Sequence, residues 1–381
     1  MATYTKYTKK SGQTAWKVSG YLGIDPNTGK QVNVEKRGFN SKKEAQLFLN
    51  RKLVEIDKNG FKKENTGDTF KDIYELWLES YKMTVKESTL MILQRDFRNH
   101  ILPKFGNKPL RKITITEVQK FANEKSKTHT QFKTFIFNIS RIFKFAIKQG
   151  IVDKNPVDRI FMPRKKEDFE KSKIKYFTQE QLNIFLTYAK EHENTKKFSF
   201  FYLMANTGTR QGELLGLQWK HVDFSSQTLK IRQTLAKGKN NRPYLEEPKN
   251  KNSKRDIPLN NETIAILKHW RKIQREEMLL YGFNTMDKEQ LVFSNRKNSF
   301  IEMSSPNYWV KCICKRSGLP QLSPHALRHT FATILISQGK DFKTVSELLG
   351  HTNISMTLDV YAGVYKEQKT DAVNVISSIL Q

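Results

Sequence analysis

Leu322-Ser-Pro-His-Ala-Leu-Arg-His-Thr-Phe-Ala-Thr333 is the stretch of this sequence that reveals most about its fold. Ser323 and Pro324 are typical of the first residues of a helix, so His325 is expected near a helix N-terminus, where backbone N–H groups attract an anion. Arg328 follows about one turn later, and the pair predicts a phosphate clamp. The apolar positions recur at helical spacing and predict a buried face, with Arg328 at its border, made of Leu327, Phe331, Ile334 and Leu335.

A metal site is the main alternative for this segment. His325 and His329 have the spacing of a zinc pair, but a metalloprotease helix places Glu directly after its first His, and Ala326 stands there. The two cysteines, Cys312 and Cys314, lack further ligands at finger-like spacing and are expected to be reduced thiols. The sequence therefore favours a site without metal.

Two other segments carry candidate polar residues. Within residues 207–217, Thr-Gly-Thr-Arg-Gln-Gly-Glu-Leu-Leu-Gly-Leu, Arg210 and Glu213 lie three residues apart and share one face of a predicted helix. Taken alone, such a pair is usually a surface ion pair. Farther on, Gly350 ends a predicted helix and presents His351, while Tyr361 alone would pass for an ordinary helical tyrosine.

The composition indicates a nucleic-acid partner. The chain has 381 residues, enough for two or three domains, and its 67 Lys and Arg against 38 Asp and Glu give a net charge of +29 and a pI near 9.9. Charge alone also fits a ribosomal or membrane-surface protein. No apolar run approaches membrane-spanning length and the N-terminus lacks a signal peptide, so we expect a cytoplasmic protein without a membrane partner.

Residues 1–65 predict a small sheet followed by one helix. Strand-like alternation in 15–24 and 31–39 flanks a turn, and Ser41 with Glu44 forms a capping box that opens the helix. The face of this helix is expected to contain Ala45, Phe48, Leu49 and Leu53 before Asn59-Gly60 ends it. The segment has 14 basic and 6 acidic residues, a net charge of +8, which favours an accessory DNA-binding domain over an inert oligomerisation module.

The rest of the chain is expected to be mostly helical. Apolar stripes between residues 66 and 160 predict a helical bundle and consist of Phe70, Ile73 and Trp77; Leu90, Leu93, Phe97 and Ile101; Val118 and Phe121; and Phe135, Ile139, Ile142, Phe143 and Ala146. The opposite faces carry either solvated charge or a phosphate-tracking surface, formed by Arg95, Arg98, Lys133, Arg141 and Lys144. Residues 161–175 have linker composition, and 176–381 mix helices with short strands between 222 and 259.

The candidate residues follow one another in a characteristic order. Arg210, then His325-x-x-Arg328, then Leu-Gly-His351 and Tyr361 resemble the signature of the tyrosine recombinases, the family of phage integrases and chromosome-dimer resolvases. His100-Ile-Leu-Pro-Lys-Phe-Gly106 and Asn155-Pro156 extend the likeness, and residues 1–65 resemble the arm-binding domain of the larger phage-type members.

The resemblance implies a domain plan and a fold class. It divides the chain into an arm-type DNA-binding domain (1–65), a helical, SAM-like core-binding domain (66–160), a linker (161–175) and a catalytic domain with a C-terminal tail (176–381). We therefore expect a multidomain, mainly α protein with small β-sheets. Its parts are an N-terminal three-stranded sheet plus helix, a helical core-binding bundle and a mixed α/β catalytic domain of the tyrosine recombinase type.

The implied chemistry is transesterification without metal, ATP or another cofactor. Tyr361 is the implied nucleophile and forms a 3′-phosphotyrosyl link. Arg210 and Arg328 are the implied phosphate ligands, with His325 and His351 as further proton-transfer or hydrogen-bonding groups. Glu213 is expected to support its neighbours rather than react.

A lysine in a β-hairpin donates the leaving-group proton in this family. The corresponding segment reads Glu247-Pro-Lys-Asn-Lys-Asn-Ser-Lys-Arg-Asp-Ile-Pro-Leu259 and nominates Lys249. Lys251 and Lys254 remain alternatives, because the loop is unusually rich in lysine.

The implied function is that of an integrase, which integrates and excises a mobile element such as a prophage. Its expected partners are double-stranded DNA at core and arm sites, three further copies in a homotetramer, an excisionase and a host DNA-bending protein. The apolar tail, residues 362–381, is expected to dock on a neighbouring protomer. The alternatives are a type IB topoisomerase, a non-enzymatic DNA-binding regulator and, least of all, a metal-dependent nuclease, because no carboxylate cluster accompanies the histidines.

Overall fold

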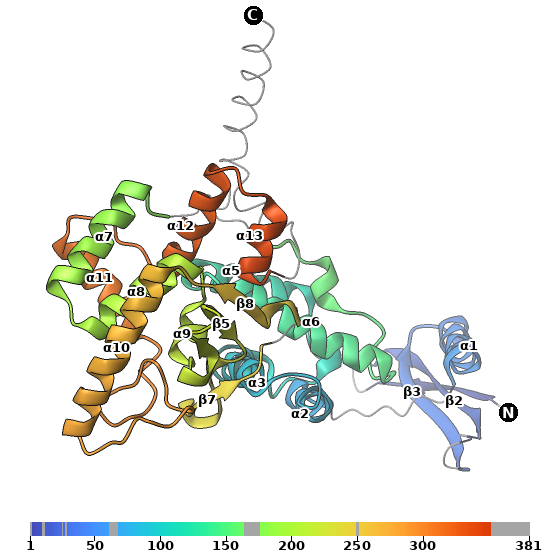
Figure 1. The fold of residues 1–381 in the computed structure, drawn as a ribbon. Coiled ribbons are helices and arrows are strands. Elements are labelled where there is room, and N and C mark those ends of the chain that lie inside the picture. Colours follow the sequence, from blue (N-terminus) through green and yellow to red (C-terminus); the bar gives the residue numbers. More distant parts are fainter. Residues whose placement is uncertain are drawn as a thin grey trace, which may run out of the picture.

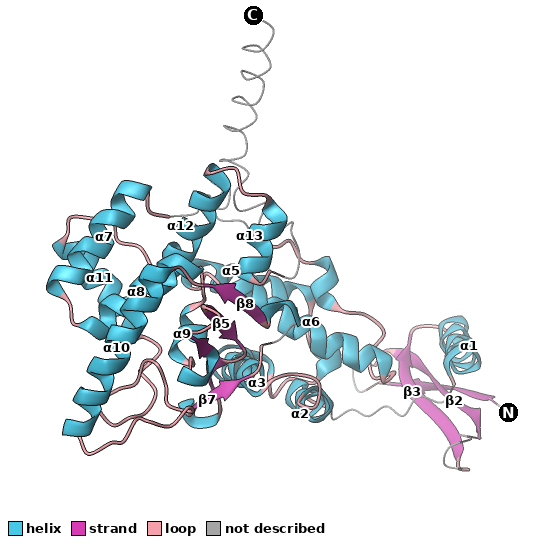
Figure 2. Ribbon diagram, viewed as in Figure 1, coloured by secondary structure: helices cyan, strands magenta, loops and turns pink. Residues whose placement is uncertain are grey.

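The structure is a computed structural model that describes residues 2–9, 12–24, 26, 29–60, 68–163, 176–248 and 251–351. Figure 1 and Figure 2 show a mainly helical chain with small antiparallel sheets, which confirms the expected fold class. In the described residues, no helix is long and apolar enough to cross a membrane.

The N-terminal part is a three-stranded sheet covered by one helix. The sheet has the order β1-β2-β3, and the elements are β1 (Ala2–Thr8), β2 (Thr14–Ile24), β3 (Gln31–Phe39) and α1 (Lys42–Asn59). Ser41 caps α1 by accepting a hydrogen bond from the Glu44 N–H at 3.1 Å, as the capping box predicted. Ala45 and Leu49 are buried against the sheet and Phe48 packs beside them, whereas Leu53, on the same predicted face, is 39% exposed.

The second part is a bundle of helices around an aromatic core. It contains α2 (Phe70–Tyr81), α3 (Glu87–Asp96), a π-helical turn η1 (Phe97–Ile101), α4 (Leu102–Phe105), α5 (Ile115–Thr128) and α6 (Phe132–Lys148), with short 3-10 turns at η2 (Leu110–Lys112) and η3 (Pro156–Arg159). Thr69 and Thr114 open α2 and α5 with complete capping boxes. The predicted stripes form the core, except that Leu90 is only half-buried.

The third part holds the remaining helices and two small sheets. Its helices are α7 (Gln179–His192), α8 (Thr195–Thr207), α9 (Gln211–Leu215), α10 (Asn261–Leu280), α11 (Ser305–Arg316), α12 (Pro324–Ser337) and α13 (Phe342–Leu349). One sheet has the order β4-β5-β8, with β4 (Val222–Asp223), β5 (Thr228–Ile231) and β8 (Arg255–Pro258). The other sheet pairs β6 (Thr234–Lys237) with β7 (Pro243–Glu246).

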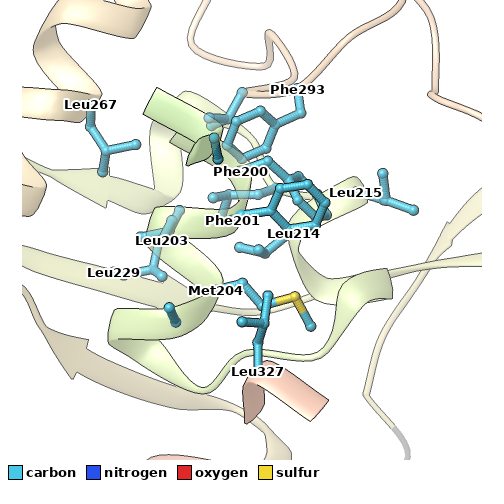
Figure 3. Packing of buried hydrophobic residues seen from close by; sticks show 14 of the residues in the cluster. Phe200, Phe201, Leu203, Met204, Leu214, Leu215, Leu229, Leu267, Phe293 and Leu327 are labelled. Atoms are coloured by element: carbon cyan, nitrogen blue, oxygen red, sulfur yellow. The ribbon is translucent and has the colours of Figure 1, made fainter. Parts of the chain in front are cut away.

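Helix α8 lies at the centre of this third part. Its residues between Ser199 and Ala205 are all buried, because α7, α10 and α12 pack around it. Figure 3 shows Leu267 of α10 and Leu327 of α12 reaching the same core from different sides of α8. This packing fixes where α12 begins, and with it the position of the quoted His-x-x-Arg segment.

The burial of α12 differs from the sequence prediction. Leu327 is buried as expected, but Phe331, Ile334 and Leu335 are only half-buried, and Arg328 is 2% exposed rather than at a border. Arg328 is buried because α12 contacts both α8 and α13, and its guanidinium reaches carbonyl groups at the ends of these two helices. A single amphipathic face does not describe a helix in this position.

The helical bundle touches the third part at the β6–β7 hairpin. The Glu87 carboxylate, in the first turn of α3, accepts a hydrogen bond from the Lys239 backbone N–H at 2.7 Å. The Lys86 ammonium group donates to the Glu247 carbonyl, and Ser88 lies within 3.4 Å of the Glu246 carboxylate. The N-terminal turn of α3 is therefore tied to the strand that leads to residue 247.

Candidate active site

Arg210 is the N-cap residue of the short helix α9. Helix α8 ends at Gly208, which adopts a left-handed conformation with φ of 59°, and α9 begins at Gln211. The Arg210 backbone N–H donates to Glu213 Oε2 at 2.9 Å, and its Nη1 donates to Glu213 Oε1 at 2.8 Å. The side chain of Arg210 is 37% exposed and that of Glu213 only 4%, so this pair is not the ordinary surface ion pair that spacing alone suggested.

Arg328, on α12, is buried and binds the C-terminal ends of α8 and α13. Its Nη1 donates to the Gly208 carbonyl and its Nη2 to the Leu349 carbonyl, each at 2.7 Å. Arg210 Nη2 approaches the Gly350 carbonyl at 3.3 Å. The two guanidinium groups thus converge on the turn after α13, which carries His351. The left-handed conformation of Gly350, with φ of 67°, makes that turn.

The histidines of the site are biased toward the neutral form. Burial, followed by Arg328 and Arg210, lowers the pKa of His351 to about 4. Burial, with His325 and Arg328, lowers the pKa of His329 to about 4 as well. Burial, then Arg328 and Arg210, also lowers the pKa of His325. The His325 and His329 rings lie edge to face with centroids 4.6 Å apart, which suits neutral imidazoles better than two cations.

Arg255 belongs to the site but was missed in the sequence. Its Nη2 and Nη1 donate to the two Glu213 oxygens at 2.8 and 3.1 Å, and its Nε donates to the Leu348 carbonyl at 2.6 Å. A signal was present: on β8, Arg255 shares the buried face with Ile257 two residues on, so a charged residue occupies an inward-facing position. Such a charge needs a buried partner, and Glu213 supplies it.

Glu213 is therefore an ionised carboxylate held between two arginines. Burial alone would raise its pKa, but hydrogen bonding and charge from Arg255, with a contribution from Arg210, lower the pKa overall. Its hydrogen bond with Nη1 keeps the more exposed guanidinium of Arg210 in one orientation.

A cavity of about 300 Å³ opens beside these groups. It is lined by Arg210, Glu213, Thr234, Glu246, Glu247, Pro248 and Ser253. Lys249 and Tyr361 lie outside the described residues. Of the alternative lysines, Lys254 forms an exposed ion pair with Glu247 at 2.9 Å. The structure thus brings Arg210, Glu213, His325, Arg328 and His351 into one region and leaves Lys249 and Tyr361 as sequence predictions.

No metal centre emerges from the described part of the chain. Within those residues, no group of three or more His, Cys, Asp or Glu side chains is arranged to hold a metal ion. Cys312 is half-buried and Cys314 is buried, and both are free thiols.

Comparison with known proteins decides the family. Residues 175–368 match the model of the phage integrase family, residues 69–126 the phage integrase N-terminal SAM-like domain, and residues 4–56 an arm DNA-binding domain. The chain belongs to the phage integrase family. It is 33% identical, over the full length of both chains, to "Tyrosine recombinase XerC-like" of Caldanaerobacter subterraneus subsp. tengcongensis. It is 25% identical to "ICEBs1 integrase" of Bacillus subtilis, covering 98% of this chain and 99% of that protein.

Solved structures of integrases share the fold. The Tn1549 transposon integrase in complex with transposon right end DNA superposes with a TM-score of 0.65 at 23% identity, covering 77% of this chain and 95% of that one. A lambda integrase dimer bound to a core site gives 0.57 at 16% identity, covering 93% and 94%. The recombinase is thus a DNA-binding enzyme that cleaves and rejoins DNA, as its motifs predicted.

Proposed function

We propose that this recombinase integrates and excises a mobile element, and that Tyr361 is its nucleophile. The observation that carries the proposal is the convergence of Arg210 and Arg328 on the turn that bears His351. Arg210, which is 37% exposed, presents a planar, permanently charged group that suits a phosphate oxygen, and the buried Arg328 fixes the turn beside it. Because Tyr361 follows that turn by ten residues, the chain can return its hydroxyl to the same place.

The proposed reaction exchanges one phosphodiester for another. The Tyr361 hydroxyl loses its proton and attacks the scissile phosphorus, the bond to the 5′-oxygen breaks, and a 3′-phosphotyrosyl link forms. Lys249 protonates the leaving 5′-oxygen. In the second step, the 5′-hydroxyl of the other strand attacks the same phosphorus and releases Tyr361. His325 is suited to accept the tyrosine proton, because its lowered pKa keeps it neutral.

The nucleophile is tested with nicked attachment-site DNA in the presence of EDTA. The wild-type chain should form an adduct that resists SDS, and Tyr361→Phe should form none. Tyr365→Phe is the matched control, because it removes the hydroxyl of a tyrosine only four residues away and should leave the adduct intact. An adduct with Tyr361→Phe would refute the assignment. An adduct on DNA of arbitrary sequence would instead indicate a topoisomerase.

The general acid is tested with DNA that has sulfur in place of the scissile 5′-oxygen. A thiolate leaving group needs no proton, so Lys249→Ala should fail on ordinary DNA and recover on the sulfur-substituted strand. Lys251→Ala and Lys254→Ala should cleave both substrates. If Lys251→Ala or Lys254→Ala instead failed on ordinary DNA and recovered on the sulfur-substituted strand, that lysine would be the general acid.

We also propose the domain plan and the assembly implied by the resemblance. Residues 1–65 would bind arm sites, 66–160 and 176–381 would enclose the core site, and 161–175 would link them. The active species would be a homotetramer on DNA in the cytoplasm, directed by an excisionase and a host DNA-bending protein. Deleting residues 1–65 should then abolish arm-site binding while leaving cleavage of a short core duplex intact.

The tail at 362–381 lies outside the described residues. We propose that it docks on a neighbouring protomer and couples assembly to the placement of Tyr361. Deleting residues 370–381 should weaken the assembled synapse or change cleavage, whereas unchanged recombination would exclude this role.

A further inference from the structure

A patch of basic residues lies on α10, away from the catalytic groups. Lys268, Arg271, Lys272 and Arg275 recur at helical spacing and line one hollow of about 460 Å³, together with Phe224. Lys268 and Lys272 are exposed, and the two arginines are half-buried. We call these four basic residues the α10 patch. At 1.5 Å per residue, the patch spans about 10 Å of helix.

The charges of the α10 patch are poorly compensated. Among the described residues, the buried Nε atoms of Arg271 and Arg275 have no hydrogen-bond partner. Burial and the neighbouring charge of Arg275 both lower the pKa of Arg271, the direction expected for a cation without an acidic partner. Glu276 is the one carboxylate that lines the described hollow.

Basic residues on and beside the β4-β5-β8 sheet are different. Each has a carboxylate within salt-bridge distance, in the pairs Lys220 with Glu289, Lys230 with Asp223, and Arg232 with Asp256. The shortage of anions is therefore a property of the α10 patch and not of the whole surface. A partly buried cation without a carboxylate partner is stabilised most strongly when an external anion binds to it.

Aromatic rings hold the patch in place. The Arg271 guanidinium lies 5.1 Å from the centroid of the Trp219 ring and 5.7 Å from that of Phe224. The Lys268 ammonium lies 5.9 Å from the Phe224 ring. Trp219 is itself anchored, because its Nε1 donates to Gln274 Oε1 on α10 at 2.7 Å. Lys268 and Arg271 are thus positioned before any ligand arrives, which lowers the entropy cost of binding.

The α10 patch and the catalytic groups lie at opposite edges of one sheet. Arg255 stands on β8, at one edge of the order β4-β5-β8, whereas Phe224 follows β4 at the other edge. Two strand spacings separate these edges by about 10 Å. In Figure 1, α10 (orange) extends away from α12 and α13. One phosphate cannot contact both sets of arginines.

We propose that the α10 patch binds the sugar-phosphate backbone of attachment-site DNA at phosphates other than the scissile one. The proposal rests on the recombinase function above. A row of four cations along one helix, with one carboxylate in the hollow, matches the repeating charge of a nucleic-acid backbone. The contacts should be independent of base sequence.

The test compares two variants that lose the same charge. Lys268→Gln/Lys272→Gln removes two exposed cations of the patch, and Lys220→Gln/Lys230→Gln removes two that already have carboxylate partners. Affinity is measured against salt for a duplex that spans only the core site and for a long attachment-site duplex. On the long duplex, the patch variant should lose about 1.8 from the slope of log K against log salt. Arg275→Gln alone should lose about 0.9. The control should keep the wild-type slope.

Adduct formation on the short core duplex separates this proposal from the proposed function. Both variants should form the adduct at the wild-type rate, which also shows that they are folded. An equal loss of slope in patch and control variants, or no loss in either, would overturn the proposal, as would impaired cleavage of the short duplex by the patch variant. Loss of polyglutamate binding with unchanged DNA binding would assign the patch to an acidic protein instead. Absence of an adduct with the wild-type chain would refute the proposed function, not the patch.

Discussion

At the scale of single residues, the site depends on one buried carboxylate. Glu213 faces Arg210, whose side chain is 37% exposed, and Arg255, whose side chain is 6% exposed. The more exposed arginine is oriented by Glu213, and the buried one ties Glu213 to the end of α13 through the Leu348 carbonyl. Removing Arg255 would leave the Glu213 carboxylate buried, with Arg210 as its one remaining positive partner.

We expect Arg255→Met to lower the free energy of unfolding by about 3 kcal/mol, because breaking a buried pair strands its partner. Lys254→Met is the matched control: it is the preceding residue, and its ion pair with Glu247 is exposed, so its effect should stay below about 1 kcal/mol. Urea unfolding of both variants measures the difference. Equal effects would mean that the Arg255 pair contributes no more than a surface pair.

The histidines predict a pH dependence of stability. His329 and His351 have a pKa of about 4 in the folded chain against an ordinary value of 6.5. The unfolded chain therefore binds more protons below pH 6.5, and stability should be complete above that value and fall as the pH decreases from 6.5 toward 4. Unfolding of the DNA-free protein at pH 7 and pH 5 measures this. His351→Gln should lose less stability between pH 7 and pH 5 than the wild-type chain does. An equal loss would contradict the lowered pKa of His351.

At the scale of elements, the turn between α8 and α9 has no room for a side chain at position 208. Gly208 has a positive φ and gives its carbonyl to Arg328. A Cβ there would lie 2.5 Å from the Phe331 ring and 2.9 Å from the Leu349 side chain. The same glycine therefore permits the turn and lets α12 and α13 approach it.

Gly208→Ala should thus combine two costs. Gly339 also has a positive φ, but a Cβ added there would meet no atom within 4 Å, so Gly339→Ala should cost only the conformational term of about 1 kcal/mol. Gly208→Ala should cost a further amount of about 1–3 kcal/mol from overpacking and should reduce adduct formation. Thermal unfolding of the two variants gives the comparison. Equal destabilisation would show that α12 and α13 adjust freely.

At the scale of the whole molecule, the bundle and the third part meet at α3 and the β6–β7 hairpin. Arg95 of α3 and Arg98 of the adjoining η1 turn line a cavity of about 640 Å³ with residues of this hairpin. Both side chains are exposed at this cavity, and their phosphate-tracking role stays a prediction.

Hydrogen exchange can test this contact. The Lys239 amide donates to Glu87, so Glu87→Ala should speed its exchange by about tenfold, the loss of one hydrogen bond to a charged group. Glu79→Ala, which removes an exposed carboxylate from α2, should leave that amide unchanged. If the Lys239 amide exchanged at the same rate in the wild type, Glu87→Ala and Glu79→Ala, α3 would not hold the hairpin in solution.

The order of the motifs was sufficient to predict the family, and local spacing predicted most elements. The capping box of Ser41 with Glu44 and the apolar stripes of the bundle depend only on neighbours within one helix, so the sequence alone determined them. Leu53 lies on the predicted apolar face of α1 but is 39% exposed, because an apolar stripe indicates which residues share a face and not how much surface exists to cover them.

The tertiary structure alone decided which charges meet. Arg255 and Glu213 are 42 residues apart, and Arg328 lies 120 residues from Gly208, so no local pattern relates them. Packing α12 between α8 and α13 is what places Arg328 inside, where it must satisfy its donors on backbone carbonyls. The sequence by itself determined the chemistry and its order along the chain, and the packing of distant helices determined which arginines are buried supports and which one faces the cavity.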